Sequence, residues 1–286
     1  MNNTHENTIL VTGATGKVGR PLTERLRAAG HTVRPVSRST PVPFDWHDAS
    51  TWAAALDGVT AAYLIAPDEP IPAEEFAAAA VQAGVRRLVA QSGRHIHLLT
   101  EAAGLTPEAI GMHAVQQAVQ GSGVEWTVLQ PNNFNQNFSE GDYHGPLLAG
   151  ELTMPLEGVR EPFIDVDDIA AVAAAVLTED GHHGRVYELS GPESLTLPEA
   201  VAIMAEASGK DMVFRADEPE EHTAALRAAG APEGLVVFLD VMYRLMREGK
   251  LGRVADGVAT VLGREPVAFK DWAARAAAEG AWAPRG

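Results

Sequence analysis

The chain has 286 residues, of which 46% are hydrophobic, and its formal net charge is −16. This length and composition suffice for one or two globular domains, whereas the acidic balance and the lack of any basic run argue against a nucleic-acid partner. Because there are no cysteines, disulfides, thiolate nucleophiles and cysteine metal sites are excluded.

A strand, a glycine-rich turn and a helix are predicted first, within residues 8–27. The apolar run 9–11 is typical of a buried parallel strand. The helix is predicted to begin near Lys17, with two leucines four residues apart on one face. Three glycines at three-residue intervals separate the strand from the helix: Gly13, Gly16 and Gly19.

Each of these glycines has a distinct task in a dinucleotide-binding turn. The first allows a sharp turn, the second admits a pyrophosphate close to the backbone, and the third allows the helix to pack against the strand. The helix N-terminus then offers N–H groups and a partial positive charge to the phosphates. The alternative is a tight turn that binds nothing, but the strand and helix on either side favour a binding site.

The second predicted strand, 31–37, bears on the type of cofactor. An NAD site usually has an acidic residue at this strand end, where it accepts hydrogen bonds from the ribose 2′-hydroxyl. Here the strand ends in Ser37 and Arg38, without a carboxylate. Arg38 could pair with a 2′-phosphate, and Lys17 could add a second positive charge. We therefore expect NADP(H) in preference to NAD(H), although Arg38 could equally be a solvated loop residue.

The segment 41–46 is predicted to form a short third strand that ends at Asp45. The acid could bond the adenine amine, and Trp46 could cover the ring or simply pack in the core. A short helix over 51–56 and a strand over 60–65 follow. The chain would then leave the sheet beside the cofactor at Ala66 and Pro67.

Further strands alternate with helices in the rest of the N-terminal half. A helix over 72–83 precedes a strand over 86–91, and a later strand spans 126–130. This alternation predicts an α/β fold, a doubly wound parallel sheet of the Rossmann type. Right-handed crossovers would then place the strand ends along one edge, where ligands bind.

The sequence changes character after Gly191, where strand-like runs become rare. We predict an NAD(P)-binding domain over 1–150, completed by 163–191, and a small, mainly helical lobe over 192–286 with part of 138–162. A substrate would sit in the cleft between them. The lobe's predicted helices span 197–208, 220–229, 233–248 and 269–280.

The chain resembles atypical short-chain dehydrogenases/reductases of the NmrA-like branch, close to the quinone-reductase and azoreductase-like members. The resemblance covers most of the chain in the family's order, and as a set it is more specific than the glycine turn alone. The matching segments are TGATGKVG (12–19), SR (37–38), RLVAQSG (87–93), GSGVEWTVLQPNNFNQNF (121–138), FIDVDDIAAVAAAVL (163–177), VYELSGPESLTLPEA (186–200) and REGKLGRVADGVATVLGREP (247–266).

This resemblance implies further residues around the cofactor. Residues 15–18 would cradle the pyrophosphate, two residues would flank the adenosine, and three would lie near the nicotinamide. In chain order these are Thr15, Gly16, Lys17 and Val18, then Ala66 and Pro67, then Ser92, Pro131 and Asn133.

One departure from the wider superfamily concerns the proton donor. Carbonyl reductases of this type usually carry Tyr-x-x-x-Lys on the helix after the fifth strand, and none of the four tyrosines here has that spacing. The corresponding segment, 107–120, offers His113, with Gln117 four residues later. Another register puts Glu108 and Met112 in the pair's places. Either His113 donates the proton, or the protein only positions the reactants and water supplies it, or His113 is structural.

Polar and aromatic residues alternate after the sixth predicted strand. We expect Phe134, Asn137 and Tyr143 to contact the substrate, with a polar turn and core aromatics as the alternative. Two histidines, His95 and His97, are too few to predict a metal, and we predict none. The loop 93–106 that carries them would border the pocket. The acids of 165–168 precede an apolar run, so helix capping explains them better than acid–base chemistry.

The sequence thus predicts an NADPH-dependent reductase of a small quinone, enone, imine or carbonyl compound. The alternative is a non-catalytic NADP(H)-binding redox sensor that acts through protein partners. No apolar run reaches the roughly 18 residues of a membrane helix, and the polar start MNNTHENT lacks a signal pattern. We therefore expect a cytoplasmic protein with no membrane or nucleic-acid partner, and a homo-oligomer is possible but not indicated.

Overall fold

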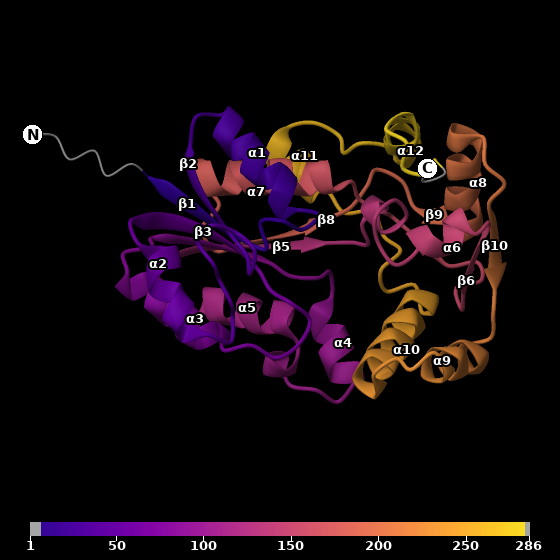
Figure 1. Cartoon of the computed structure of the whole chain (residues 1–286), viewed down its shortest axis with the longest axis horizontal. Coiled ribbons are helices and arrows are strands. Elements are labelled where there is room, and N and C mark those ends of the chain that lie inside the picture. The colour runs from indigo at the N-terminus through magenta and orange to yellow at the C-terminus, as the bar shows by residue number, and fades with distance from the viewer. Residues whose placement is uncertain (1–6, 284–286) are drawn as a thin grey trace, which may run out of the picture.

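The computed structural model describes residues 7–283, so most of the polar start lies outside it. Over this range a six-stranded parallel sheet has the order β2-β1-β3-β4-β5-β8 (Figure 1). This confirms the predicted Rossmann-type sheet. The order reverses at β1, with β2 on one side and β3 on the other, which is where such sheets bind ligands. The strands are β1 (Thr8–Thr12), β2 (Thr32–Val36), β3 (Val59–Ile65), β4 (Arg87–Gln91), β5 (Glu125–Pro131) and β8 (Arg185–Leu189).

Helices cover both faces of this sheet (Figure 1). One face carries α1 (Gly19–Ala28), α7 (Val166–Thr178) and α11 (Gly257–Leu262). The other carries α2 (Trp52–Leu56), α3 (Ala73–Gln82) and α5 (Gly111–Gln120). Helix α11 comes from the last quarter of the chain, so the chain returns to the sheet near its C-terminal end.

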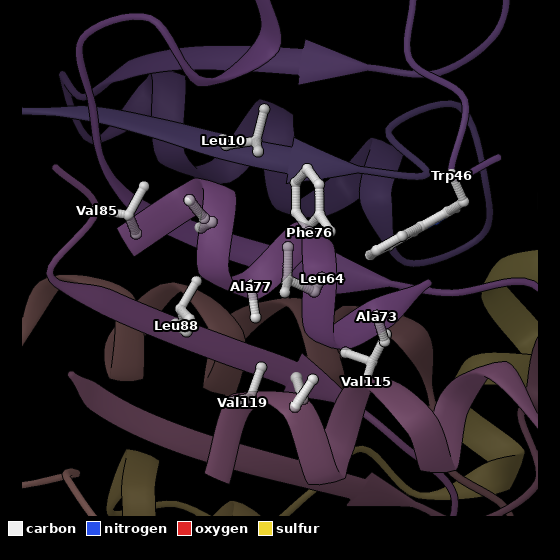
Figure 2. Close-up of a cluster of buried hydrophobic side chains, with 14 of the residues drawn as sticks. Leu10, Trp46, Leu64, Ala73, Phe76, Ala77, Val85, Leu88, Val115 and Val119 are labelled. Carbon is white, nitrogen blue, oxygen red and sulfur yellow. The ribbon is translucent and has the colours of Figure 1, made fainter. Parts of the chain in front are cut away.

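Each face has its own hydrophobic cluster, because the inner strands alternate apolar side chains toward both layers. Figure 2 shows the cluster under α3 and α5, where the Phe76 ring lies among Leu10, Leu64 and Trp46. The opposite cluster packs α1 and α7 against the sheet. Since the strands are buried on both sides, the strand ends are held in fixed register with one another.

A third cluster forms the lobe at the end of the molecule away from the N-terminus (Figure 1). Its small sheets pair β10 with β6 and β7 with β9. The strands are β6 (Glu151–Met154), β7 (Arg160–Glu161), β9 (Leu195–Thr196) and β10 (Val213–Ala216). The lobe's helices are α6 (His144–Leu148), α8 (Leu197–Ser208), α9 (Pro219–Ala228), α10 (Glu233–Arg247) and α12 (Phe269–Ala278). A further helix, α4 (Ile96–Ala102), follows β4 and packs on α10, so it connects the sheet domain to the lobe.

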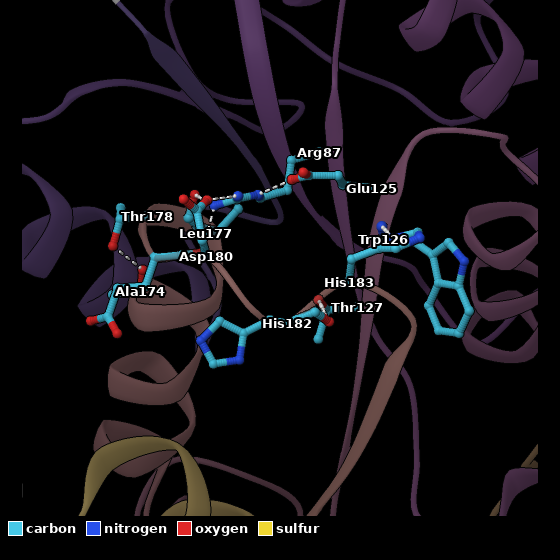
Figure 3. A network of polar contacts seen from close by, with 11 residues as sticks. Arg87, Glu125, Trp126, Thr127, Ala174, Leu177, Thr178, Asp180, His182 and His183 are labelled. Carbon is cyan, nitrogen blue, oxygen red and sulfur yellow. Dashed lines mark hydrogen bonds and ion pairs between the residues drawn. The ribbon is translucent and has the colours of Figure 1, made fainter.

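The amino edge of the sheet is closed by a polar network around Arg87 (Figure 3). The guanidinium donates to Glu125 at 2.9 Å, to Asp180 at 2.8 Å and to the carbonyl of Glu179 at 2.8 Å. It thereby fastens the C-terminus of α7 to β4 and β5. A cavity of about 380 Å³ lies beside this network, between Arg86 and Thr178, at the edge opposite the glycine turn. It is therefore not the predicted cofactor site.

Outside the glycine turn, three predictions of local structure were wrong. The segment 41–46 is not a strand but forms a single bridge, Ser37 to Pro43, because prolines at 41 and 43 lack the N–H groups that a ladder needs. The predicted loop 93–106 contains α4. The helix predicted over 107–120 is interrupted at Ile110, which is extended.

The interruption at Ile110 has a steric reason. A Cβ at Gly111 would lie 2.1 Å from the carbonyl oxygen of Pro67, in the loop after β3. The first residue of α5 is therefore in close backbone contact with that loop. The Gly111 N–H also donates to the carbonyl of Asp68 at 3.1 Å. Within residues 7–283, no helix combines the length and apolar character needed to cross a membrane.

Candidate cofactor site

The glycine turn has the geometry that its spacing predicts. Gly13 has a φ of +60°, and the Gly16 N–H donates to the Gly13 carbonyl at 2.9 Å. A Cβ at Gly19 would lie 2.2 Å from that same carbonyl oxygen, so only glycine fits there. The helix begins at Gly19 and not near Lys17, and its N-cap residue Val18 makes no side-chain capping bond. The Arg20 N–H donates to the Gly16 carbonyl at 3.1 Å, so the turn itself supplies part of the cap, and the positive end of the helix dipole at this point suits an anion.

The remaining predicted cofactor residues follow other strands of the same sheet. Because all six strands are parallel, their carboxyl ends meet at the edge that carries the glycine turn. The structure thus brings the predicted cofactor residues that follow these strands to one edge of the sheet. Ser37 and Arg38 follow β2, Ala66 and Pro67 follow β3, Ser92 follows β4, and Pro131 and Asn133 end or follow β5.

Lys17, for which a phosphate contact was predicted, already has a side-chain partner. Its Nζ donates to Oδ1 of Asn137 at 2.7 Å, and a Cβ at Gly141 would lie 2.6 Å from that nitrogen. Next to it, Arg20 pairs with Glu140 at 3.2 Å on the surface. These contacts tie the glycine turn to the segment 137–141, which borders the lobe.

On the adenosine side, Arg38 is exposed and forms no ion pair within residues 7–283. The loop around it is folded by Ser37, whose N–H donates to Oγ1 of Thr40 at 2.7 Å. Asp45 accepts a hydrogen bond from the backbone of His47 at 2.9 Å. Trp46 is buried, and its Nε1 donates to the Ile65 carbonyl at 3.3 Å. The contact between Trp46 and adenine therefore stays a prediction, since packing in the core already accounts for the position of the indole ring.

A buried carboxyl, Glu161 on β7, faces the loop after β5. The amides of Asn132 and Asn133 donate to its Oε2 at 2.7 and 3.1 Å. Glu161 is 1% exposed, and burial raises its pKa to about 7 despite the two amides and the nearby charge of Arg94. Glu161 is not among the site residues predicted from the sequence. The one feature of the sequence that could have indicated its burial is its position directly before the apolar run 162–164.

Several buried polar atoms in this region have no hydrogen-bond partner in the described part of the chain. Leaving such a group unsatisfied costs about 1–3 kcal/mol, so a cluster of them indicates a place built for a ligand or for water. The atoms are Ser92 Oγ, Arg94 Nη2, Asn132 Oδ1, Glu161 Oε1 and both side-chain polar atoms of Asn135. Together with the glycine turn, they fit the polar nicotinamide half of a dinucleotide.

His113 lies on α5 with both ring nitrogens near other side chains. Nδ1 is 3.2 Å from Oγ1 of Thr100, and Nε2 is 3.4 Å from Nε2 of Gln117. Burial and the nearby His97 lower its pKa, against the opposing charge of Glu108. Met112, which takes the lysine's place in the alternative register, lies close to the end of β4. Its sulfur would be 3.0 Å from a Cβ added at Gly93.

We expect His113→Ala to act on stability more than on catalysis. Losing the buried ring and its two contacts should lower the free energy of unfolding by about 1–3 kcal/mol. Turnover per folded molecule should stay within about threefold of wild type. Urea denaturation and steady-state kinetics measure the two effects. A hundredfold loss of turnover with unchanged stability would instead identify His113 as the proton donor.

The predicted substrate residues line the junction with the lobe. Phe134 is half-buried against the hydrophobic cluster between the sheet and helices α1 and α7. The side-chain oxygen of Asn137 accepts a hydrogen bond from Lys17. The Tyr143 ring lies 5.3 Å from that of Phe138. Burial raises the pKa of Tyr143, as do the nearby Tyr243 and Glu161. Their contact with a substrate stays a prediction.

The acids before α7 serve structure, as predicted. Asp165 is the N-cap residue and accepts from the Asp167 N–H at 3.1 Å. It also contacts the guanidinium of Arg275, and Asp168 pairs with Arg264 at 2.7 Å. Among residues 7–283, no three His, Asp or Glu side chains come together to hold a metal ion.

Comparison with known proteins agrees with this geometry. Residues 5–264 match the model of the NmrA-like family. The NAD(P)H azoreductase of Xenophilus azovorans is 33% identical, with 96% of this chain and 99% of the relative aligned. An uncharacterized oxidoreductase of Bacillus subtilis is also 33% identical, with 96% of each covered.

Among solved structures, an NADPH-dependent quinone oxidoreductase of Escherichia coli in complex with NADPH shares the fold. Its TM-score is 0.73 at 23% identity, over 93% of this chain and 99% of that one. The family match and the two relatives cover the glycine turn, the strand ends and the lobe together. The chain belongs to the NmrA-like family.

Proposed function

We propose that this oxidoreductase uses NADPH to reduce a small conjugated acceptor, such as a quinone, an enone, an imine or a carbonyl compound. The observation that carries the proposal is the glycine turn, in which Gly19 approaches the Gly13 carbonyl too closely for any side chain. Such an approach fits a phosphate-binding turn at the sheet's switch point. The name of the azoreductase relative supports reduction of a conjugated acceptor.

NADP(H) is proposed over NAD(H) because of the loop after β2. Arg38 is exposed, free of ion pairs in the described chain, and no acid stands at the end of the strand. A guanidinium binds a phosphate through two parallel N–H groups, whereas a carboxylate there would repel it.

The chain's own residues would position the reactants. Bound NADPH supplies a hydride. Residues 15–18 would hold the pyrophosphate, while Ser92, Pro131 and Asn133 would bound the nicotinamide, and Phe134 and Tyr143 the acceptor. Without a Tyr-x-x-x-Lys pair, catalysis would rest on proximity and orientation, which suffice for strongly activated acceptors whose proton comes from water.

The test begins with binding. Purified protein is titrated with NADPH and with NADH, and oxidation of the cofactor is then followed with a panel of quinones, azo dyes and enones. Tight NADPH binding with turnover of a panel member supports the reductase. Binding without turnover would favour the redox-sensor alternative, which the missing Tyr/Lys pair motivates. Failure to bind either nucleotide would contradict both functions.

A further inference from the structure

We propose that Glu161 is a positioning residue for the nicotinamide, which it serves by fixing the Asn133 amide and by supplying a negative charge beside the ring. The inference rests on the proposed function, since it requires a nicotinamide at the ends of β4 and β5. It concerns a residue that the glycine turn and the strand-end motifs do not include.

Asn133 is held in one orientation by its backbone and its side chain. Its carbonyl accepts from the Ile164 N–H at 2.9 Å, which fixes the backbone, and its Nδ2 donates to Glu161. With the nitrogen committed, Oδ1 is the atom left to face a ligand. An amide oxygen accepts hydrogen bonds, and the nicotinamide carboxamide carries an N–H₂ donor. Asn132 makes the same bond to Oε2 from a buried position, so two amides hold the same carboxyl oxygen.

Glu161 lies near the strand ends where the nicotinamide half of the cofactor is expected. With the pyrophosphate at the glycine turn and the adenosine toward β2, the other half of a dinucleotide extends over β3, β4 and β5. Three strand spacings, roughly 14 Å, separate β1 from β5. Glu161 is bonded to the residues that directly follow β5, and other buried polar atoms without partners lie in the same region.

A buried acid at this position is costly. A glutamine would offer the same acceptor oxygen without a charge, whereas an ionised carboxyl at 1% exposure is expensive. Its Oε1 has no hydrogen-bond partner within the described chain. The nearby charge of Arg94 offsets part of this cost, but the pKa of Glu161 stays raised. A cofactor ring that becomes positive on reaction gives a further reason for an acid, because a preorganised opposite charge stabilises it.

The charged and titratable groups around Glu161 are few. Arg94 faces it from the loop after β4 but already pairs with Glu188 at 3.0 Å. Tyr143 faces it from the segment before α6. The adjacent Arg160 is exposed and pairs with Glu199 at 3.1 Å. Burial raises the pKa of Glu161 to about 7, so the side chain changes charge within the range where enzymes are assayed.

The sign of the effect follows from the two cofactor forms. The oxidised nicotinamide ring is cationic and the reduced ring is neutral. Below pH 7 Glu161 is protonated and does not distinguish them by charge. Above pH 7 it is ionised and favours NADP⁺ over NADPH by about tenfold, the size of a charge interaction across roughly 10 Å in protein. The 2′-phosphate also titrates near pH 6, but it is common to both forms and cancels in their ratio.

The experiment measures the Kd of NADP⁺ and of NADPH by calorimetry between pH 5.5 and 8.5. In wild type, the preference for NADP⁺ should rise about tenfold across this range. It should stay flat in Glu161→Gln. The matched control is Glu157→Gln, the same change at an exposed acid four residues earlier, which should behave as wild type.

A second measurement tests the hydrogen bond separately from the charge. The 3-acetylpyridine analogue of NADP⁺ lacks the amide N–H₂, so wild type should bind it about five- to tenfold more weakly than NADP⁺. In Glu161→Leu, where Asn133 is released, the difference should shrink to about twofold.

The outcomes separate this inference from the proposed function. A wild-type preference that is independent of pH would overturn it, and this measurement needs no variant that might misfold. A pH-dependent preference that survives in folded Glu161→Gln would assign the charge elsewhere and overturn it as well. If wild type binds neither NADP⁺ nor NADPH, the proposed function itself fails.

Discussion

Replacing Gly19 with alanine is expected to abolish dinucleotide binding, with a loss of affinity above about a hundredfold. The added Cβ would lie 2.2 Å from the Gly13 carbonyl oxygen and 2.7 Å from Cα of Ala14. Both neighbours are backbone atoms, so either the turn or the start of α1 must move. Overpacking of this kind costs about 1–3 kcal/mol of stability and sometimes more. The displaced N–H groups can no longer converge on a phosphate.

Gly234→Ala is the matched control for this substitution. Gly234 also lies in the first turn of a helix, α10, but a Cβ there meets nothing within 4 Å. The control should bind NADPH as wild type does and gain up to about 1 kcal/mol of stability from helix propensity. Thermal unfolding and fluorescence titration with NADPH report both quantities. If Gly19→Ala binds NADPH normally, the turn does not hold the phosphates.

The main fold was predictable because its signals are local and repeated. The apolar run 9–11 and the glycines that follow it determine strand, turn and helix within twenty residues. The helix predicted over 197–208 matches α8 because Thr196 and Glu199 form a capping box, a short-range device. Parallel topology then follows from the alternation of strands and helices.

The three wrong predictions have two kinds of cause. The strand expected over 41–46 failed for a local reason, because prolines at 41 and 43 interrupt a run that is otherwise strand-like, although Phe44 is buried all the same. The other two depend on contacts between distant segments. The interruption at Ile110 depends on Pro67, which is more than forty residues away. α4 is stabilised by packing on α10, more than a hundred residues later. Neither Pro67 nor α10 is visible in a local window of sequence around the segment that it contacts.

The candidate site divides in the same way. Strand-end residues such as Ser92 and Asn133 could be placed from order alone, because parallel strands share an edge. Glu161 could not, since its significance lies in burial and in two amides from another segment. Lys17 was assigned a phosphate from its position in the turn, whereas its Nζ reaches Asn137, 120 residues away.

Changing Arg38 to glutamate is expected to raise the Kd of NADPH about a hundredfold, and that of NADH by less than about threefold. Charge-assisted hydrogen bonds contribute about 1.5–3 kcal/mol, and an opposite charge at the same place adds repulsion. The arginine is exposed and bound to no acid in the described chain, so the substitution leaves no buried group unpaired. The fold should therefore be unaffected.

Arg27→Glu makes the same change of charge at another exposed arginine, in the last turn of α1. It separates a local phosphate contact from a general effect of charge on an already acidic protein. Raising the salt concentration should reduce the difference between NADPH and NADH in wild type, because salt screens exposed charges. Equal losses for both cofactors in Arg38→Glu would remove this arginine from the 2′-phosphate site. Any preference for NADPH measured in wild type would then have to come from another cation, and Lys17 could serve only by leaving Asn137 when the cofactor binds.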